Sequence, residues 1–124
     1  RLDIPQPIWD GDRLVGRVAH VDYYGNLITD ITGALAADAL TAPNVALMFV
    51  AETGNPDERA WCVTQRGSHF AAGPEQAPFL LRDSTGRLTV AVRNASAAAL
   101  THARRGTRVT LTGLRRATEE SSGV

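Results

Sequence analysis

The chain consists largely of short runs of strand-forming residues separated by turn-forming residues, and this alternation limits its fold more than any other feature. The runs are rich in β-branched and aromatic side chains, and Gly, Pro, Asn and Asp gather between them. The runs that we assign to strands are 13–24, 26–31, 44–50, 60–65, 78–83, 87–93 and 107–113. Closely spaced short strands of this kind predict an all-β fold, a small antiparallel β-barrel with one short helix.

Two of these runs distribute their apolar side chains differently. The run 87–93 alternates, which predicts a strand with Leu88, Val90 and Val92 on one face and Arg87, Thr89 and Arg93 on the other. The run 44–50 is apolar throughout, which predicts a strand that is buried on both faces.

Helical character is confined to two segments. Residues 94–106 are rich in alanine, Asn94 or Ser96 can cap the start of a helix there, and Gly106 can end it. Residues 34–40 predict a helical turn at most. The sequence therefore predicts a single short helix, between the last two strands.

The two ends of the chain lack the patterning of its middle. Residues 1–12 are rich in Pro and Asp and predict the remnant of an interdomain linker, and residues 116–124 predict a flexible tail. We expect one barrel domain over residues 13–115. A chain of this size buries roughly 65% of the surface that it exposes when unfolded, which is enough for one core.

Composition argues against several classes of function. The 13 basic and 13 acidic side chains cancel, whereas proteins that bind nucleic acid usually carry a basic excess. No apolar stretch is long enough to span a membrane and no signal peptide is visible, so we expect a cytoplasmic protein. His20, His69 and His102 lack the spacing of metal ligands, so we expect no metal. The single cysteine, Cys62, predicts a small core residue.

The densest group of chemically versatile side chains is Asp22-Tyr23-Tyr24-Gly25-Asn26. It forms either the turn of a tight hairpin or a bend of one strand at Gly25. An Asn amide can pair with two atoms of a purine edge, a Tyr ring can stack on a base, and a carboxylate can hold an ammonium group. The alternative is an Asx-type turn with a half-buried Tyr.

A second group, Asp83-Ser84-Thr85-Gly86, lies between two predicted strands. Ser84 and successive backbone N–H groups can bind a carboxylate. The alternative is an ordinary hairpin turn in which Gly86 takes a positive φ. Phe70 has two readings as well, as a core residue or as a ring that stacks on a ligand.

Two segments, in this order, resemble one family. The segment GRVAHVDYYGNLITDI (16–31) is similar to the family pattern G-x-V-x-x-x-D-x-F-G-N-L-I-T-N-I, and DSTGRLTVAVRNASAA (83–98) is similar to N-S-x-G-x-L-E-I-A-V-N-x-G-x-A-A. The segment THARRGTRVTL is similar to the family's ending, in which a Gly precedes the last strand. Over roughly residues 5–113, the chain thus resembles the C-terminal domain of the S-adenosyl-L-methionine (SAM) hydroxide adenosyltransferases, relatives of the bacterial fluorinating and chlorinating enzymes.

This resemblance implies a two-domain hydrolase that converts SAM and water to adenosine and L-methionine. In the family, an N-terminal α/β domain holds the ribose and activates the nucleophile, while the C-terminal barrel clamps the adenine and the methionine end. The sites form between neighbouring protomers of a homotrimer, and no metal or further cofactor is implied. The catalytic residues are then expected in the N-terminal domain, and this chain alone is expected to be inactive.

The resemblance also implies substrate-binding roles for individual residues. Those residues are Asp22, Tyr24, Asn26, Phe70, Ser84, Thr85 and Asn94. Asp22 and Ser84 would hold the methionine ammonium and carboxylate groups, Asn26 the adenine edge, and Phe70 would stack on the adenine ring. Thr85 stands where the halogenating relatives carry Arg, which favours water over a halide ion as the nucleophile.

The resemblance leaves two points less fully specified. Tyr24 replaces the family's Phe, and its added hydroxyl needs a hydrogen-bond partner. One residue among Val92, Arg93 and Asn94 presents backbone groups to the adenine, and the sequence leaves open which one does so.

The leading hypothesis predicts that Asp22, Asn26, Phe70 and Ser84 converge on one rim of the barrel. Two alternatives are a stand-alone binding module, such as a barrel for single-stranded nucleic acid, and a structural assembly domain without catalytic activity. The low aromatic content of 6% and the zero net charge argue against the nucleic-acid alternative.

Overall fold

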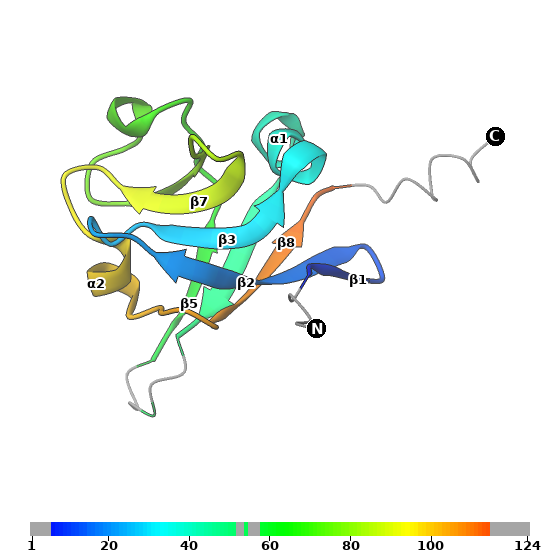
Figure 1. Cartoon of the computed structure of the whole chain (residues 1–124), viewed down its shortest axis with the longest axis horizontal. Helices are drawn as coiled ribbons and strands as arrows, with labels where there is room; N and C mark the ends of the chain where they lie inside the picture. The colour runs from blue at the N-terminus through cyan, green and yellow to red at the C-terminus, as the bar shows by residue number, and fades with distance from the viewer. Residues whose placement is uncertain (1–5, 52–53, 55–57, 115–124) are drawn as a thin grey trace.

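The structure, a computed structural model, describes residues 6–51, 54 and 58–114. This part of the chain contains eight strands, two α-helices and one short 3-10 helix (Figure 1). In chain order they are β1 (Ile8–Asp10), β2 (Arg13–Val21), β3 (Leu27–Thr32), α1 (Gly33–Thr41), β4 (Ala46–Val50), β5 (Ala60–Val63), η1 (Phe70–Ala72), β6 (Pro78–Arg82), β7 (Arg87–Val92), α2 (Ala97–Thr101) and β8 (Arg108–Thr112).

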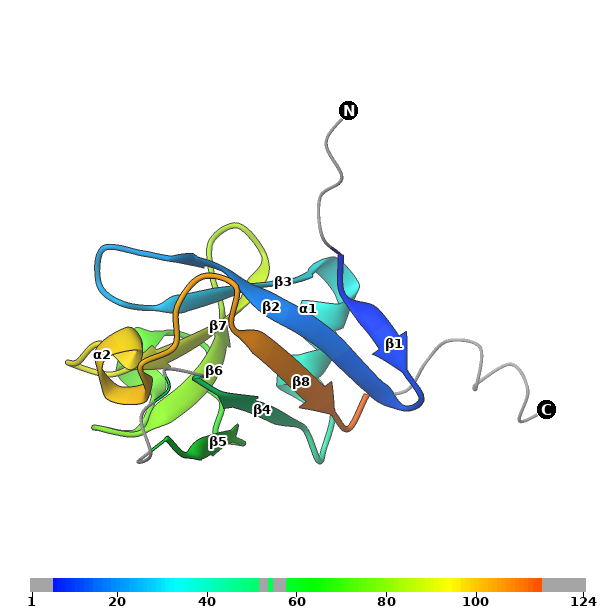
Figure 2. The ribbon, with the colours of Figure 1, turned by 90° about the horizontal axis from the view of Figure 1, so that it is seen from below.

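All named strands pair antiparallel in a single sheet that curls into a nearly closed barrel. The strand order is β5-β4-β8-β2-β3-β7-β6, and β1 extends β2 as a separate hairpin. The chain just after β5 meets β6, because Leu80 N–H donates to the Gln65 carbonyl at 2.8 Å and Gly67 N–H donates to the Leu80 carbonyl at 2.9 Å. The predicted all-β barrel is therefore confirmed, and α1 and α2 lie at opposite ends of it in both views (Figures 1 and 2).

The barrel interior is filled by the alternating apolar side chains of its strands. Leu88, Val90 and Val92 of β7 point into this core, as the sequence predicts. The other face of β7 is also buried, because Ala91 packs with Phe79 and Leu81 of β6 in a second small cluster. This second cluster underlies the segment between β5 and β6, which carries Phe70.

The first motif forms the β2–β3 hairpin, which was the first of the two readings of this segment. A bulge between Val18 and His20 interrupts the pairing of β2 with β3. Asp30 reaches back across β2, where its Oδ1 accepts a hydrogen bond from the Arg17 N–H at 3.0 Å. A Cβ atom added at Gly16 would lie 2.4 Å from that oxygen, so the glycine that opens the motif makes room for the acid near its end.

Helix α1 is longer than the helical turn that the sequence predicts. It spans nine residues, and a side chain from a distant segment completes its C-terminal end. Arg66 donates from Nη1 to the carbonyl oxygens of Ala39 and Ala42, which satisfies groups that a helix end leaves unpaired. Since Arg66 is far away in sequence, local pattern could not reveal this support.

Helix α2 is much shorter than the predicted helix over 94–106. Ser96 is its cap, since its Oγ accepts the Ala99 N–H at 3.0 Å. The helix ends at His102, which takes a left-handed conformation with φ 63°. Gly106 instead belongs to the next turn, which leads into β8.

Two predictions for β4 and β5 are wrong. In β4, Leu47 and Phe49 point inward but Met48 and Val50 are 36% and 39% exposed, so this strand has one open face. Cys62 of β5 pairs with Met48 and is exposed, so it is not a core residue. The apolar run alone could not show that the described chain leaves the outer face of these strands open.

The N-terminal segment is more regular than its composition predicts. Residues 8–10, expected within a linker, form β1 and pair with β2. The rest of the predicted linker before residue 6, and the predicted tail after residue 114, lie outside the described residues. No helix in the described ranges is long and apolar enough to cross a lipid bilayer.

Candidate functional site

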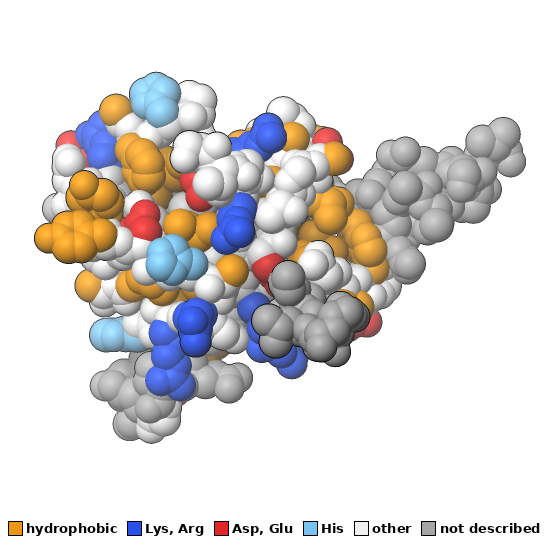
Figure 3. Space-filling view, in the orientation of Figure 1, with side chains coloured by type: hydrophobic (Ala, Val, Ile, Leu, Met, Phe, Trp, Pro, Cys, Tyr) orange, Lys and Arg blue, Asp and Glu red, His pale blue; other side chains and the backbone are white. Residues whose placement is uncertain are grey.

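Three segments that are distant in sequence surround a hollow of about 470 Å³ at one end of the barrel. We call it the aromatic hollow, and its lining residues are Tyr24, Asn26, Phe70, Val92, Asn94 and Ala95. They come from the β2–β3 turn, from η1, and from the end of β7 with the turn that follows it. This end lies on the left of Figure 3, where apolar side chains gather on the surface. The structure therefore brings together four of the residues predicted to bind substrate: Tyr24, Asn26, Phe70 and Asn94.

Asp22 organises the β2–β3 turn beside this hollow. Its Oδ1 accepts the backbone N–H groups of Tyr24 and Asn26, each at 2.9 Å. Its Oδ2 accepts a hydrogen bond from Asn26 Nδ2, also at 2.9 Å. Asp22 thus has the Asx-turn role that was the alternative reading, and it also fixes the orientation of the nearly buried Asn26 amide.

Gly25 lets this turn dock against the start of α2. It has a φ of 81°, and a Cβ atom added there would lie 1.9 Å from Ser96 Oγ. The Gly25 carbonyl accepts the Ala98 N–H at 2.9 Å. Both the left-handed conformation and the close contact require glycine, and together they place Asn26 at the edge of the hollow.

The aromatic side chains around the hollow are open to solvent. Tyr23 is 95% exposed and Tyr24 73%, and their rings are perpendicular with centroids 5.3 Å apart. Water can therefore satisfy the Tyr24 hydroxyl. Phe70 is 47% exposed, so it is not the core residue that one reading of it predicts. Exposed rings at the mouth of a hollow are suited to contact a planar ligand.

The segment that carries Phe70 is anchored on both sides. Beneath it, Gly73 packs directly on Phe79, since an added Cβ atom would lie 2.1 Å from the Phe79 ring. At its side, Arg93 donates from Nη1 to the Ala71 carbonyl at 3.1 Å and forms an ion pair with Glu75. These contacts fix the position of Phe70 relative to the end of β7.

Arg93 has a structural role in this region that the sequence did not predict. It was one of three candidates for presenting backbone groups to a ligand, but its side chain instead ties β7 to the η1 segment, while Val92 and Asn94 line the hollow. Asn94 takes a left-handed φ of 62°, which Asn tolerates better than most residues. No local signal marks Arg93, because Glu75 is 18 residues away in sequence.

The second group of predicted residues forms a hairpin turn between β6 and β7. Asp83 Oδ1 accepts the backbone N–H groups of Thr85 and Arg87 and the Thr85 hydroxyl. Burial raises the pKa of the Asp83 carboxyl, but these hydrogen bonds outweigh it and hold the pKa below its usual range. Ser84 and Thr85 themselves are exposed.

This second turn lies at the far end of β7 from the aromatic hollow. Arg87 pairs with Thr32, whereas Val90 pairs with Leu27, next to Asn26. A six-residue strand is roughly 17 Å long. The expected convergence is therefore only partial: Asp22, Asn26 and Phe70 meet at one end of the barrel, and Ser84 lies with Thr85 at the other.

The described residues contain no group of three His, Cys, Asp or Glu side chains that could hold a metal ion. His20, His69 and His102 are separately exposed on β2, before η1 and after α2. The polar groups at the aromatic hollow are carboxamides and a carboxylate, which suit hydrogen bonding to an organic ligand.

Comparison with solved structures supports the fold. An uncharacterized conserved protein from Thermotoga maritima superposes with a TM-score of 0.70 at 20% identity, over 90% of this chain and 40% of that one. A conserved hypothetical protein from Thermus thermophilus gives a TM-score of 0.56 at 28% identity, over 89% of this chain and 39% of that one. The chain thus spans about two fifths of the length of these proteins.

Comparison with known families gives a more specific result. No curated protein gives a match. The family model for the SAM hydroxide adenosyltransferase C-terminal domain matches residues 16–110, which include both motifs and all three segments around the aromatic hollow. This match covers most of the chain, and the chain therefore belongs to the SAM hydroxide adenosyltransferase family as its C-terminal domain.

Proposed function

We propose that this domain holds the adenosyl group of SAM while a preceding domain of the same protein carries out hydrolysis. The observation that carries this proposal is the aromatic hollow, in which both family motifs and Phe70 meet. Its volume of about 470 Å³ lies within the range of small-molecule pockets, about 300–1,000 Å³.

The chemistry of the hollow suits an adenine ring. Phe70 and Tyr24 offer ring faces for stacking, and Val92 and Ala95 add apolar contact. Asn26 can accept a hydrogen bond from the adenine amino group and donate one to the neighbouring ring nitrogen, as Asn does at adenines elsewhere.

Asp22 acts in this proposal as a positioning residue for Asn26. The Asn26 Nδ2 group has two N–H bonds, and Asp22 Oδ2 accepts one of them at 2.9 Å. The second N–H and the carbonyl oxygen of the amide then stay available to a purine. This pre-orientation lowers the entropy that Asn26 loses when a ligand binds.

The residues proposed to contact the methionine end of the substrate lie farther apart than those proposed to contact the adenine. Asp22 lies beside the aromatic hollow, but Ser84 and Thr85 lie at the opposite end of β7. A substrate that uses both turns must lie extended along this strand. The ammonium contact of Asp22 and the carboxylate contact of Ser84 therefore stay predictions.

In the proposed reaction, a water oxygen attacks the ribose C5′ atom and forms a C–O bond. The C5′–S bond breaks, and its electron pair converts the sulfonium into the thioether of methionine. The proton of the attacking water passes to a base or to solvent. Because the sulfonium is already a good leaving group, this domain contributes by holding the substrate in place and limiting the access of water.

We also propose that the site is completed by another protomer of a homotrimer. The proposal is supported by the openness of the hollow, where Tyr24 and Phe70 remain exposed. A pure assembly role is a second candidate, which the exposed apolar side chains of Met48 and Val50 on β4 favour.

Isothermal titration calorimetry of the chain with adenosine tests the binding role. The chain should bind adenosine, and Phe70→Ala should weaken binding about tenfold, as expected for loss of one stacking ring. Ile8→Ala, which removes an exposed apolar side chain on β1, outside the hollow, is the control and should leave binding unchanged. Absence of binding by the parent chain, or an equal loss in both variants, would favour the assembly role.

A further inference from the structure

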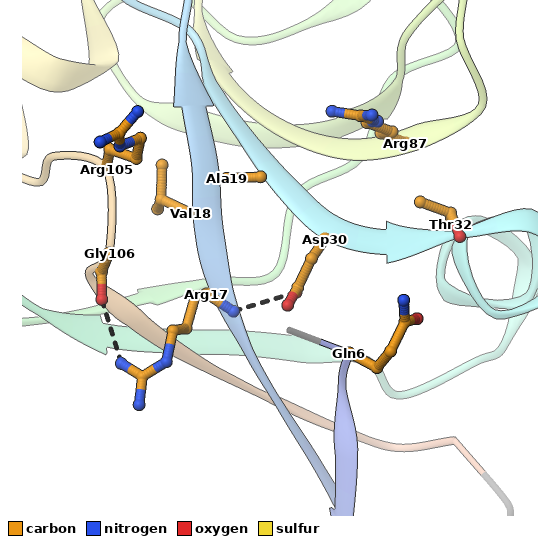
Figure 4. A pocket seen from close by; sticks show the side chains of 9 residues that line it. All are labelled: Gln6, Arg17, Val18, Ala19, Asp30, Thr32, Arg87, Arg105 and Gly106. Atoms are coloured by element: carbon orange, nitrogen blue, oxygen red, sulfur yellow. Dashed lines mark hydrogen bonds between the residues drawn. The ribbon is translucent and has the colours of Figure 1, made fainter. Parts of the chain in front are cut away.

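A second concave region lies on the barrel away from the aromatic hollow, along β2 and the turn before β8. It consists of two adjoining hollows of about 440 Å³ and 370 Å³ that share Arg17, Arg105 and Gly106. We call it the arginine groove, and the arginines that line it are Arg17, Arg87, Arg104, Arg105 and Arg108. Figure 3 shows basic side chains gathered low on this face, and Figure 4 shows the first hollow from close by.

The turn that carries two of these arginines is fixed to the barrel. Thr107 N–H donates to the Arg104 carbonyl at 3.0 Å, which closes the turn. Gly106 N–H donates to the Val18 carbonyl and Val18 N–H donates to the Thr107 carbonyl, each at 2.8 Å. These reciprocal bonds join the turn to β2 beside its bulge, so the backbone positions of the arginines are pre-organised.

The acidic residue of the groove is already engaged. Asp30 Oδ1 accepts the Arg17 N–H at 3.0 Å, and the Arg17 guanidinium points away from it and donates to the Gly106 carbonyl at 3.1 Å (Figure 4). Asp30 therefore orders the base of the groove and leaves the guanidinium of Arg17 without a carboxylate partner among the described residues.

Among the described residues, the other guanidinium groups of the groove form no ion pair, although Arg87 lies near enough to Asp83 to help lower the pKa of that carboxyl. Within the described ranges, the ion pairs of arginine are Arg13 with Asp10 and Arg93 with Glu75, and neither pair lies in the groove. Among the described residues that line it, the groove thus holds five arginines and one carboxylate, Asp30, so positive charge is in excess in this concave region. Such a concentration creates a local positive potential that attracts anions.

We propose that the arginine groove binds an anion that carries two or more adjacent phosphate groups, as in a free polyphosphate or the phosphate chain of a nucleotide. Guanidinium groups match phosphate oxygens through paired N–H donors. One phosphate group would engage only one or two arginines, whereas a chain of phosphates matches a row of them. The two hollows have the size of small-molecule sites, which favours a compact anion.

Calorimetric titration of the whole chain with tripolyphosphate, at about 50 mM salt, tests this assignment. The double variant Arg104→Gln/Arg105→Gln should weaken binding at least about tenfold, because it removes two charge-assisted contacts. The double variant Arg59→Gln/Arg82→Gln removes the same charge at exposed positions outside the groove and should leave binding unchanged. Absence of tripolyphosphate binding, or an equal loss in both double variants, would overturn the proposal.

Further titrations distinguish the source of the phosphate groups. ATP that binds as tightly as tripolyphosphate indicates recognition of the phosphate chain alone, and tighter binding of ATP indicates a nucleotide. The variant Asn26→Ala should bind tripolyphosphate and ATP as the parent chain does, because Asn26 lines the aromatic hollow and not the arginine groove. A duplex oligonucleotide that binds more tightly than tripolyphosphate, and loses binding in the groove variant, would assign the groove to nucleic acid instead.

Discussion

The turns at Asp22 and Asp83 have the same local structure but very different surroundings. In both turns the aspartate Oδ1 accepts the N–H groups two and four residues further along the chain. In both turns, the backbone carbonyl oxygen of the aspartate accepts a hydrogen bond from the backbone N–H of the glycine three residues later, at 3.0 Å. Gly25 and Gly86 have φ values of 81° and 84°. The sequence pattern Asp-x-x-Gly therefore produces one turn twice.

The surroundings decide what each turn can do. Gly25 is pressed against Ser96 at the start of α2, whereas the space around Gly86 is open except for the Arg82 guanidinium. Asn26, after the first turn, is 4% exposed and lines the aromatic hollow, whereas Arg87, after the second turn, is exposed and borders the arginine groove. Tertiary contacts, and not the turn motif itself, thus decide which hollow the residues of a turn border.

The largest difference between the turns should appear when their glycines are replaced. Gly25→Ala should lower the free energy of unfolding by about 3 kcal/mol, since it adds the clash with Ser96 to the cost of the left-handed conformation. Gly86→Ala should lower it by only about 1 kcal/mol, since it carries the conformational cost alone. Urea denaturation measures both values, and equal losses would show that α2 does not constrain the first turn.

Replacing the two aspartates separates turn stability from binding. Asp22→Ala and Asp83→Ala should each lower the free energy of unfolding by about 1–2 kcal/mol through lost hydrogen bonds. Only Asp22→Ala should also weaken adenosine binding, by about tenfold, because it releases the Asn26 amide. Calorimetry with adenosine checks this difference, and weaker binding in Asp83→Ala as well would contradict it.

Helix α2, which packs against the first turn, can be destabilised by replacing its N-cap residue, Ser96. Ser96→Ala removes the hydrogen bond to the Ala99 N–H and should cost about 1 kcal/mol of stability. Ser84→Ala changes an exposed serine in the second turn and should leave the melting temperature unchanged. Thermal denaturation followed by circular dichroism compares the two, and similar shifts would mean that the cap contributes nothing.

The smallest expected effect is a dependence of stability on pH through the second turn. The pKa of Asp83 is lowered in the folded protein, so its stabilising contribution is present above its ordinary value of 3.8 and is lost as the pH falls through the folded value. Asp83→Asn should therefore flatten the acid side of the stability profile. Urea denaturation at a series of acidic pH values measures this, and parallel profiles would contradict it.

Local pattern predicted the strands whose apolar side chains alternate toward one core. The segment 87–93 became β7 with the expected apolar face toward the core, and the segment 107–113 became β8. Prediction failed where a distant residue decided the outcome. Arg66 completes the end of α1 and Arg93 anchors the η1 segment, and neither contact has a signal in its own neighbourhood.

The candidate site shows the same limit. Asp22, Tyr24 and Asn26 could be singled out because they are adjacent in one motif, whereas Phe70 stayed open between a core role and a stacking role until the family resemblance favoured stacking. The separation of Ser84 from Asn26 was not predictable, because it follows from the register of β3 with β7. A motif records which residues are close in sequence, but strand register determines which ends of the strands meet.

The sequence by itself determined the two Asp-x-x-Gly turns and the alternation of the strands, because both depend on residues that are close in the chain. It also determined the membership of the family, because that rests on the residues of the motifs and on their order along the chain. The tertiary structure alone decided that the first turn gains walls from α2 and η1, and that arginines from β2, β7 and the turn before β8 share one groove. The physical reason is that closure of the barrel brings distant segments into contact, and those contacts set burial, glycine clashes and the local density of charge.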